Sequence, residues 1–155
     1  MVVVSDTSPI SNLAVVDQLE LLRKVFSRII IPQAVFDELQ RSPVQIRFGE
    51  WIEVAQAENS RLIETLLKEL DAGEAHAIAL AIERRVDWLL IDEKKGRQVA
   101  IELSLPIIGL LGVLLRAKHE GFIDTVKPIM DDLRTKANFR IATNVYEHLL
   151  ELAGE

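Results

Sequence analysis

Five short aliphatic runs, separated by segments with helical periodicity, constrain the fold of this chain more than any other feature. The runs are VVVS (2–5), RIII (28–31), WIEVA (51–55), DWLLI (87–91) and PIIG (106–109). Short aliphatic runs of this kind are typical of strands in a sheet that is covered on both faces. Their alternation with helices predicts a parallel sheet with right-handed crossovers. We therefore expect an α/β fold in three layers, with a central parallel sheet of about five short strands flanked by helices.

Several signals predict where helices begin and end. Asp17 and Glu20 have the spacing of a capping box, Pro32 and Pro128 suit first helical turns, and Gly121 suits a helix end. Apolar stripes predict the buried helix faces, and they comprise Leu19, Leu22, Val25 and Phe26 in one segment and Leu62, Ile63, Leu66, Leu67 and Leu70 in another.

The length of 155 residues fits one domain, 1–155, whose C-terminal part from about residue 110 is predicted to be mostly helical. A terminal helix has an apolar side formed by Val145, Leu149, Leu150 and Leu152. That side packs either on its own domain or on a second copy of the chain, and the sequence does not distinguish the two.

Composition excludes several classes of protein. The chain has no cysteine, so neither a disulfide framework nor a thiolate zinc site is available. It shows no secretory leader and no apolar run long enough to span a membrane, so we expect a cytoplasmic protein. The net charge of −6 argues against a surface that is basic throughout, although a local basic strip is compatible with it.

Four acidic residues are expected at one edge of the sheet. Asp6 directly follows the first strand and Asp92 the fourth, and ligands of open parallel sheets bind beyond the carboxyl ends of the strands. Glu38 lies in the helix after the second strand. Glu74 begins the helix GEAHAIALAIERR and precedes Ile78 by four residues, on the apolar stripe.

Each acid taken alone has an ordinary structural explanation. Asp6 and Asp92 have the position of helix caps, and Asp71 with Glu74 has capping-box spacing. Glu38 alone is more typical of a solvated helix residue. Together, however, several carboxylates at one edge repel one another unless a cation lies among them.

Mg²⁺ or Mn²⁺ suits such a site better than zinc because both prefer oxygen ligands. The three histidines, His76, His119 and His148, are scattered and are interpreted as structural or exposed. A divalent ion held by carboxylates activates water and polarises a phosphodiester, so hydrolysis is the chemistry that this pattern favours.

Supporting residues surround the acids in the sequence. Thr7, Ser8 and Asn12 can orient a carboxylate, contact a phosphate or cap a helix. The local basic strip DEKKGR contributes Lys94, Lys95 and Arg97 as candidate phosphate contacts, or as ordinary solvated residues of a first turn. Arg84 and Arg85 are weaker candidates for the same role.

The chain resembles PIN-domain proteins, close to the VapC-like ribonuclease toxins and their prokaryotic relatives. The segments VVSDTSPISNL, IIIPQAVFDEL, LDAGEAHAIALA and WLLIDEKKGRQVA resemble the four acidic motifs of that family in order, over roughly residues 2 to 100. The resemblance implies Mg²⁺- or Mn²⁺-dependent endonucleolytic cleavage of RNA, with Asp6, Glu38, Glu74 and Asp92 at the acidic positions. Whether Glu93 also faces the metal is left open by the sequence Ile91-Asp92-Glu93.

The resemblance also implies partners, namely an RNA substrate, a second copy of the chain in a homodimer, and a cognate antitoxin. Two other interpretations compete with the nuclease. One is a catalytically idle PIN-like module for protein binding or regulation. The other is a phosphoryl-transfer domain, such as a haloacid-type phosphatase. The sequence disfavours this interpretation because haloacid-type enzymes need a second Asp at the position where this chain has Ser8.

Overall fold

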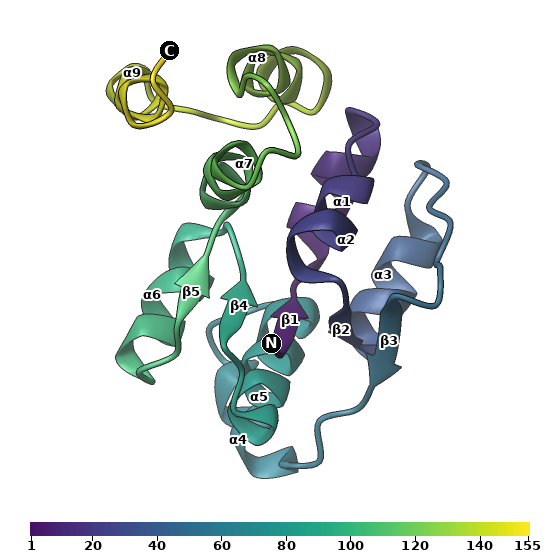
Figure 1. Ribbon diagram of the computed structural model, residues 1–155. Coiled ribbons are helices and arrows are strands. Elements are labelled where there is room, and N and C mark those ends of the chain that lie inside the picture. Colours follow the sequence, from purple (N-terminus) through teal and green to yellow (C-terminus); the bar gives the residue numbers. More distant parts are fainter.

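The computed structural model describes all 155 residues and contains one five-stranded parallel sheet (Figure 1). The spatial order of the strands is β3-β2-β1-β4-β5. Their bounds are β1 (Val3–Ser5), β2 (Ile29–Pro32), β3 (Ile52–Ala55), β4 (Trp88–Leu90) and β5 (Ile107–Ile108). All five predicted strands are therefore confirmed, and each differs from its predicted range by a residue or two at its ends.

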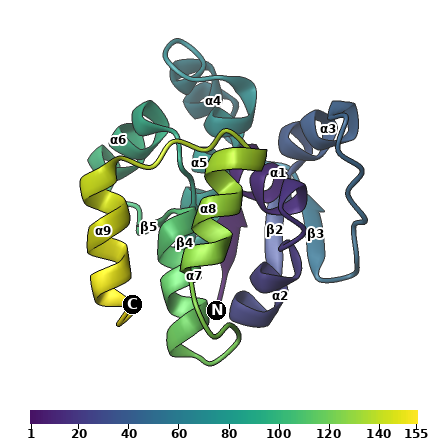
Figure 2. The same ribbon diagram turned by 90° about the horizontal axis from the view of Figure 1, so that it is seen from above.

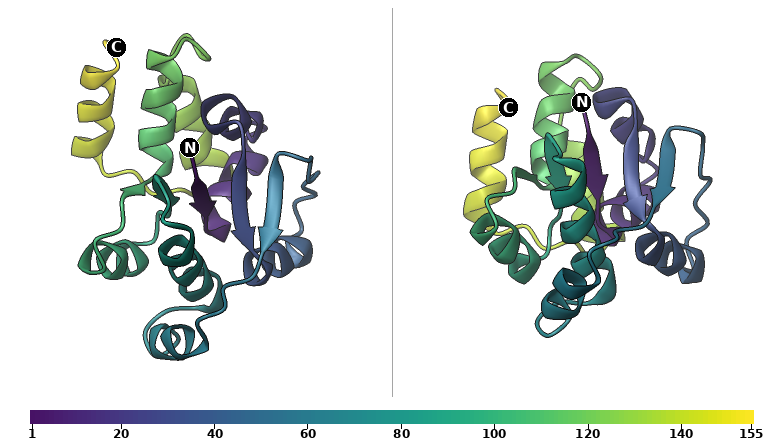
Figure 3. Two further views of the ribbon diagram at one scale, coloured as in Figure 1. Left: turned by 60° about the horizontal axis from the view of Figure 1, so that its bottom comes forward. Right: turned by 90° about the horizontal axis from the view of Figure 1, so that it is seen from below.

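Helices connect the strands and cover both faces of the sheet, which confirms the predicted three-layer α/β fold (Figure 3). They are α1 (Thr7–Val15), α2 (Glu20–Phe26), α3 (Gln33–Arg41), α4 (Ser60–Leu66), α5 (Ala72–Arg84), α6 (Lys94–Glu102), α7 (Leu110–His119), α8 (Lys127–Lys136) and α9 (Thr143–Leu152).

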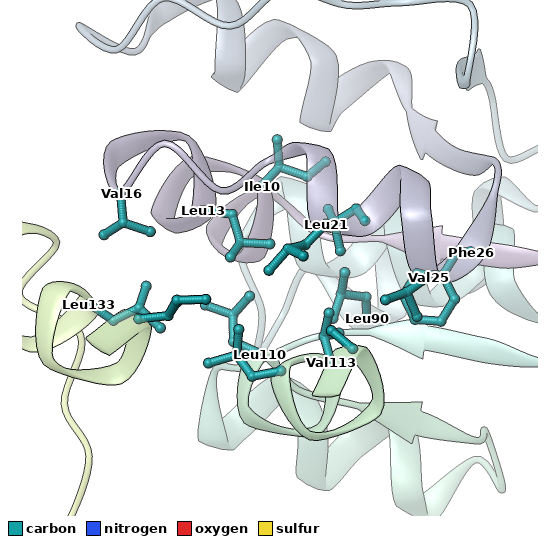
Figure 4. Packing of buried hydrophobic residues seen from close by; sticks show 14 of the residues in the cluster. Ile10, Leu13, Val16, Leu21, Val25, Phe26, Leu90, Leu110, Val113 and Leu133 are labelled. Atoms are coloured by element: carbon teal, nitrogen blue, oxygen red, sulfur yellow. The ribbon is translucent and has the colours of Figure 1, made fainter. Parts of the chain in front are cut away.

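Two apolar cores lie on opposite faces of the sheet because successive strand residues point to opposite sides. Val3 and Leu90 belong to the larger core, which packs against α1, α2, α7 and α8. Figure 4 shows side chains of α1 and α2 facing those of α7 and α8 across this core. Val4 and Leu89 belong to the smaller core, which is completed by residues of α4, α5 and α6.

The order of the strands creates a switch point in the middle of the sheet. The chain passes from β1 to β2 and β3 on one side, and then returns to β4 and β5 on the other side of β1. Helix connections leave β1 and β4 in opposite directions, so the ends of these two strands border a crevice. Open α/β sheets bind ligands in this kind of crevice.

Two of the predicted helix boundaries agree with the structure and two do not. Pro32 is the last residue of β2 and the N-cap of α3, so it lies just outside the first turn. Pro128 lies in the first turn of α8, and Gly121 has a φ of 83° just beyond α7. Asp17 does not form a capping box with Glu20, because Asp17 has a φ of 59° in the preceding turn and α2 has no side-chain cap. Leu67 is also not part of the buried stripe, since it is 43% exposed beyond the end of α4.

The three C-terminal helices gather on one side of the molecule (Figure 2). Helix α9 packs on its own chain through the buried Leu149, whereas Val145 and Leu152 remain largely exposed. At the C-terminus, the Glu155 carboxylate accepts hydrogen bonds from the N–H groups of Val126 and Lys127 at the start of α8. None of the helices combines the length and apolar character that crossing a membrane requires.

We expect Leu13→Ala to destabilise the protein by about 2–5 kcal/mol, because Leu13 is fully buried between α1 and the C-terminal helices and its truncation leaves a cavity. Urea denaturation measures the change. Leu103→Ala is the matched control, since Leu103 is 40% exposed and its truncation creates no internal cavity. Equal losses in the two variants would contradict the placement of Leu13 in the larger core.

Candidate functional site

Asp6 lies at the centre of the sheet, where β1 ends and α1 begins. Its backbone N–H donates a hydrogen bond to the Leu90 carbonyl (3.0 Å), which extends the pairing of β1 with β4. The residue occupies the N-cap position of α1, but its side chain makes no capping hydrogen bond. Asp6 is nevertheless only 3% exposed. Helix capping therefore does not account for this buried carboxyl group.

Glu38 points towards Asp6 and not into water. Its Oε2 accepts a hydrogen bond from the Thr7 hydroxyl (2.7 Å), so Thr7 orients Glu38. Both acids also approach Gly73 on α5: a methyl group at Gly73 would lie 2.8 Å from Glu38 Oε1 and 3.1 Å from Asp6 Oδ1. The absence of a side chain at Gly73 is what lets α5 come this close to the two acids.

Glu74 forms the predicted capping box and also faces the site. The Glu74 N–H donates to Asp71 Oδ1 (2.8 Å), and the Glu74 Oε1 accepts from the Asp71 N–H (3.4 Å). The other oxygen, Oε2, is buried and has no hydrogen-bond partner. It lies where a methyl group at Gly96 would come within 2.5 Å. Capping thus uses one oxygen of Glu74 and leaves the other free.

Asp92 follows β4 and has the same divided role. Its Oδ1 accepts a hydrogen bond from the Leu110 N–H at the start of α7 (3.0 Å), while its Oδ2 is buried without a partner. The N-cap of α6 is Glu93, so Asp92 does not cap the helix that follows it in the chain. Arg97 Nη1 and Asp92 Oδ1 both crowd the face of Gly109, and a methyl group there would lie 2.6 and 2.8 Å from them.

Burial gives three of these carboxyl groups unusual proton affinities. It raises the pKa of Asp6 from 3.8 to about 7, with smaller contributions from the negative charges of Glu74, Asp71 and Glu38. Burial likewise raises the pKa of Glu74 to about 7, assisted by the charge of Asp71. The pKa of Asp92 rises to about 6 for the same reason, although the Leu110 N–H and the Arg97 guanidinium oppose the shift.

The acids form a continuous line of like charges along the edge of the sheet. The negative charges of Glu38, Asp71 and Glu74 raise the pKa of Asp6. The negative charge of Glu93 raises the pKa values of both Glu74 and Asp92. The sequence interpretation placed Asp71 in a cap only and left the role of Glu93 open. In the structure both add negative charge between the four predicted acids.

The donors along this line suit a hard divalent cation. Unpartnered, buried carboxylate oxygens of Glu74 and Asp92 are costly unless something positive satisfies them, and Mg²⁺ and Mn²⁺ prefer oxygen ligands. No three His, Asp or Glu side chains lie close enough together to hold one metal ion between them. Mg²⁺ commonly uses only one or two carboxylates and keeps several waters, so an open arrangement of this kind fits its chemistry.

The predicted supporting residues divide into two groups. Ser8, Asn12 and Lys94 line a cavity of about 400 Å³ together with Asp92, and Arg97 lines a second cavity beside it. Lys95 is exposed and lines neither cavity.

Arg84 and Arg85 are not close to the site. They lie at the C-terminal end of α5, about 15 Å or more along the helix from Glu74, and Arg84 forms an ion pair with Glu53 (3.7 Å). The histidines play no part in the line of acids either: His119 and His148 are exposed, and His76 Nδ1 is hydrogen-bonded to the Ala72 carbonyl (2.8 Å).

Sequence reasoning missed the glycines that allow the acids to approach one another. Gly73 lies in the first turn of α5 and Gly96 in the first turn of α6. An isolated glycine within a helical sequence pattern is the signal that would have identified them. The segment 138–140 between α8 and α9, which also lies against Asp92, carried no comparable signal in the sequence.

Comparison with known proteins confirms the resemblance to PIN-domain proteins. A family model described as a PIN domain matches residues 2–155. No curated protein and no solved structure matches the chain.

The raised pKa values predict how stability depends on pH without metal. The folded pKa of Asp6 lies above its unfolded value, so its contribution to stability is full below about pH 4 and is lost as pH rises through about 7. The difference in unfolding free energy between Asp6→Asn and the parent should therefore change by roughly 2–3 kcal/mol from about pH 5 to pH 8, in favour of the variant. Urea denaturation in EDTA at both pH values measures this difference.

Asp124→Asn is the matched control for this experiment, because Asp124 is exposed. The difference between this variant and the parent should stay constant over the same pH range. A difference between Asp6→Asn and the parent that also stays constant would show that Asp6 does not titrate near neutral pH.

Proposed function

The chain belongs to the PIN-domain family, and on this premise we propose that it is a Mg²⁺- or Mn²⁺-dependent endoribonuclease that hydrolyses RNA phosphodiester bonds. PIN domains are generally nucleases. RNA as the substrate, the metal requirement and the residues that act are our proposal. We also propose that residues 1–155 form a single domain of this family.

The observation that carries the proposal is the row of buried carboxyl groups at the switch point of the sheet. Asp6 and Asp92 end the neighbouring strands β1 and β4, and free oxygens of Glu74 and Asp92 have no hydrogen-bond partner. Burial of this kind destabilises a protein, so a functional site that needs the acids is the best physical reason to retain them.

In the proposed mechanism, Asp6, Glu38, Glu74 and Asp92 would hold one or two divalent ions, with one or two carboxylates on each ion and water completing its coordination. When bound, Mg²⁺ or Mn²⁺ supplies Lewis-acid polarisation of the phosphodiester and lowers the pKa of water. Thr7 fixes the direction of the Glu38 carboxylate through its hydrogen bond. The capping box holds Glu74 in place while its second oxygen stays available.

Lys94 and Arg97 are the proposed phosphate contacts, because both line cavities that also include Asp92. Lys95, which the sequence also suggested, lies outside the described cavities next to Asp92 and is proposed to act only through its general positive charge. Ser8 and Asn12 line the same cavity as Lys94 and are proposed to donate hydrogen bonds to the substrate.

The biological setting that we propose follows the family resemblance. The protein acts as the toxin of a toxin–antitoxin pair in the cytoplasm, is silenced by a cognate antitoxin and forms a homodimer. The alternative remains a PIN-like module that binds metal but cleaves nothing. Metal binding without cleavage of any RNA would favour that alternative.

We expect purified protein to cleave a mixed RNA pool in Mg²⁺ or Mn²⁺ and to lose this activity in EDTA. Asp6→Asn should reduce the cleavage rate at least about 100-fold, equivalent to about 2.7 kcal/mol of transition-state stabilisation, because it removes a charged ligand while keeping the shape of the side chain. The measurement is the initial rate of product formation on a denaturing gel.

Asp124→Asn, with its exposed side chain, is the control and should cleave like the parent. Cleavage by Asp6→Asn at the rate of the parent would contradict the role of Asp6.

Metal binding should also stabilise the fold. A ligand present at about 100 times its Kd stabilises the native state by about 2.7 kcal/mol. We expect Mn²⁺ to raise the melting temperature of the parent, and Glu74→Gln to lose most of this rise because the free Oε2 is replaced while the capping box is kept. Differential scanning calorimetry with and without Mn²⁺ measures both effects.

Glu147→Gln on the exposed face of α9 is the control for nonspecific charge effects. It should respond to Mn²⁺ as the parent does. If Glu74→Gln also responds as the parent does, Glu74 is not a ligand of the ion.

A further inference from the structure

We propose that the cavity between β5, α7 and the α8–α9 loop binds a nucleotide of single-stranded RNA that neighbours the phosphate at Asp92. This inference rests on the proposed function and adds to it a subsite that the acidic motifs do not contain. The cavity has a volume of about 530 Å³, within the range of pockets that hold small ligands. Its walls combine the sheet with the C-terminal helices, with Trp88 and Ile108 from the sheet and Phe139 and Arg140 from the loop.

The interior of this cavity suits a nucleobase. Most of its lining is apolar and includes two aromatic rings, those of Trp88 and Phe139, together with Ile107, Ile108 and Val145. Every nucleobase has an apolar π-face, and proteins that bind single strands commonly offer aromatic side chains to it. An apolar cavity alone would not identify a nucleotide, so the charged groups of the lining decide the class of ligand.

Two guanidinium groups and one carboxylate complete the lining. The guanidinium groups of Arg97 and Arg140 both line the cavity and form no ion pair and no hydrogen bond, although that of Arg97 lies beside Asp92 near Gly109. Both can contact an anion. Asp92 contributes the buried Oδ2 that has no partner. Two guanidinium groups beside an apolar interior that contains aromatic rings fit a nucleotide, in which a planar base and a phosphate are covalently joined.

A second cavity adjoins the first on the other side of Asp92. It has a volume of about 400 Å³ and is lined by Ser8, Asn12, Lys94 and Asn138. Both cavities include Asp92, Phe139 and Arg140, so they meet at these residues. An extended strand can therefore place one base in the apolar cavity, a phosphate near Asp92 and its next nucleotide along the polar cavity.

The loop that carries Phe139 and Arg140 is fixed by contacts between its flanking helices. Arg134 on α8 donates to the Ile141 carbonyl (2.7 Å), and its guanidinium lies over the Tyr146 ring (4.1 Å to the centroid). The Tyr146 hydroxyl on α9 donates to Asp131 of α8 (2.6 Å). A loop that is ordered before binding loses less conformational entropy when the ligand binds, so these contacts favour a preformed subsite.

The test is binding of a short fluorescein-labelled single-stranded RNA, measured by fluorescence anisotropy in EDTA and again in Mg²⁺. We expect Phe139→Ala to weaken binding about 10-fold, as the loss of one base-stacking contact does. Arg140→Ala should also weaken binding and should reduce the slope of log K against log salt by about 0.7, which is the value for one lost phosphate contact on a single strand. Arg140→Lys should restore that slope.

Matched controls separate these effects from general changes in charge and apolar surface. Arg47 precedes β3, the outer strand on the side of the sheet opposite to β5. Phe122 is 40% exposed in the turn after α7. Arg47→Ala and Phe122→Ala should bind like the parent. The same RNA annealed to its complement should bind more weakly, because paired bases are not free to enter the apolar cavity. Thermal unfolding followed by circular dichroism verifies that each variant is folded.

Outcomes for the subsite are distinct from those for the nuclease. Loss of binding in Phe139→Ala and Arg140→Ala supports the subsite even if no RNA is cleaved, and in that case the proposed function alone fails. The subsite is overturned if the folded variants bind like the parent, if the controls lose as much affinity, if duplex binds as well as single strand, or if the parent binds RNA in neither EDTA nor Mg²⁺. If all variants bind RNA like the parent and cleave it in Mg²⁺ at the parental rate, the result supports the nuclease function and contradicts the subsite.

Discussion

The rest of the site depends on the pairing of β1 with β4, because this pairing brings two aspartates from distant parts of the chain to the same edge of the sheet. Asp6 and Asp92 follow these strands, and the Asp6 N–H continues the ladder to the Leu90 carbonyl. Both strands are buried on their two faces by apolar cores, so the carboxyl groups at their ends are partly withdrawn from water. The fold thus sets both the position of the acids and their raised pKa values.

The close approach of helices to this edge depends on glycines. Gly73 lets α5 pack against Asp6 and Glu38, Gly96 makes room for Glu74, and Gly109 makes room for Asp92 and Arg97. A methyl group at any of the three would meet a side chain of the site within 3 Å. The close approach of the helices crowds these acids, and the electrostatic cost of this crowding favours a role beyond stability.

The C-terminal helices connect the acidic edge to a surface that the motifs do not reach. Figure 2 shows α8 and α9 on the same side of the molecule as α7, and the loop between α8 and α9 lies against Asp92. The proposed nucleotide subsite therefore combines residues that the family motifs supply with residues that a separate part of the chain adds. Under the proposed function, the acids would provide the chemistry and the added helices would determine which strand of RNA fits.

The sequence by itself determined the five strands, the parallel sheet and the placement of Asp6 and Asp92, because hydrophobic runs and strand ends are local properties of the chain. It also determined the capping box of Asp71 and Glu74, whose spacing is local. Only the tertiary structure decided that Glu38 turns towards Thr7, that one oxygen of Glu74 stays free, and that Phe139 and Arg140 lie beside Asp92. These features are contacts between residues far apart in sequence, which depend on how whole elements pack and leave no periodic trace in the chain. The failed capping box at Asp17 has the same origin, because packing placed that residue in a left-handed turn that its spacing from Glu20 could not reveal.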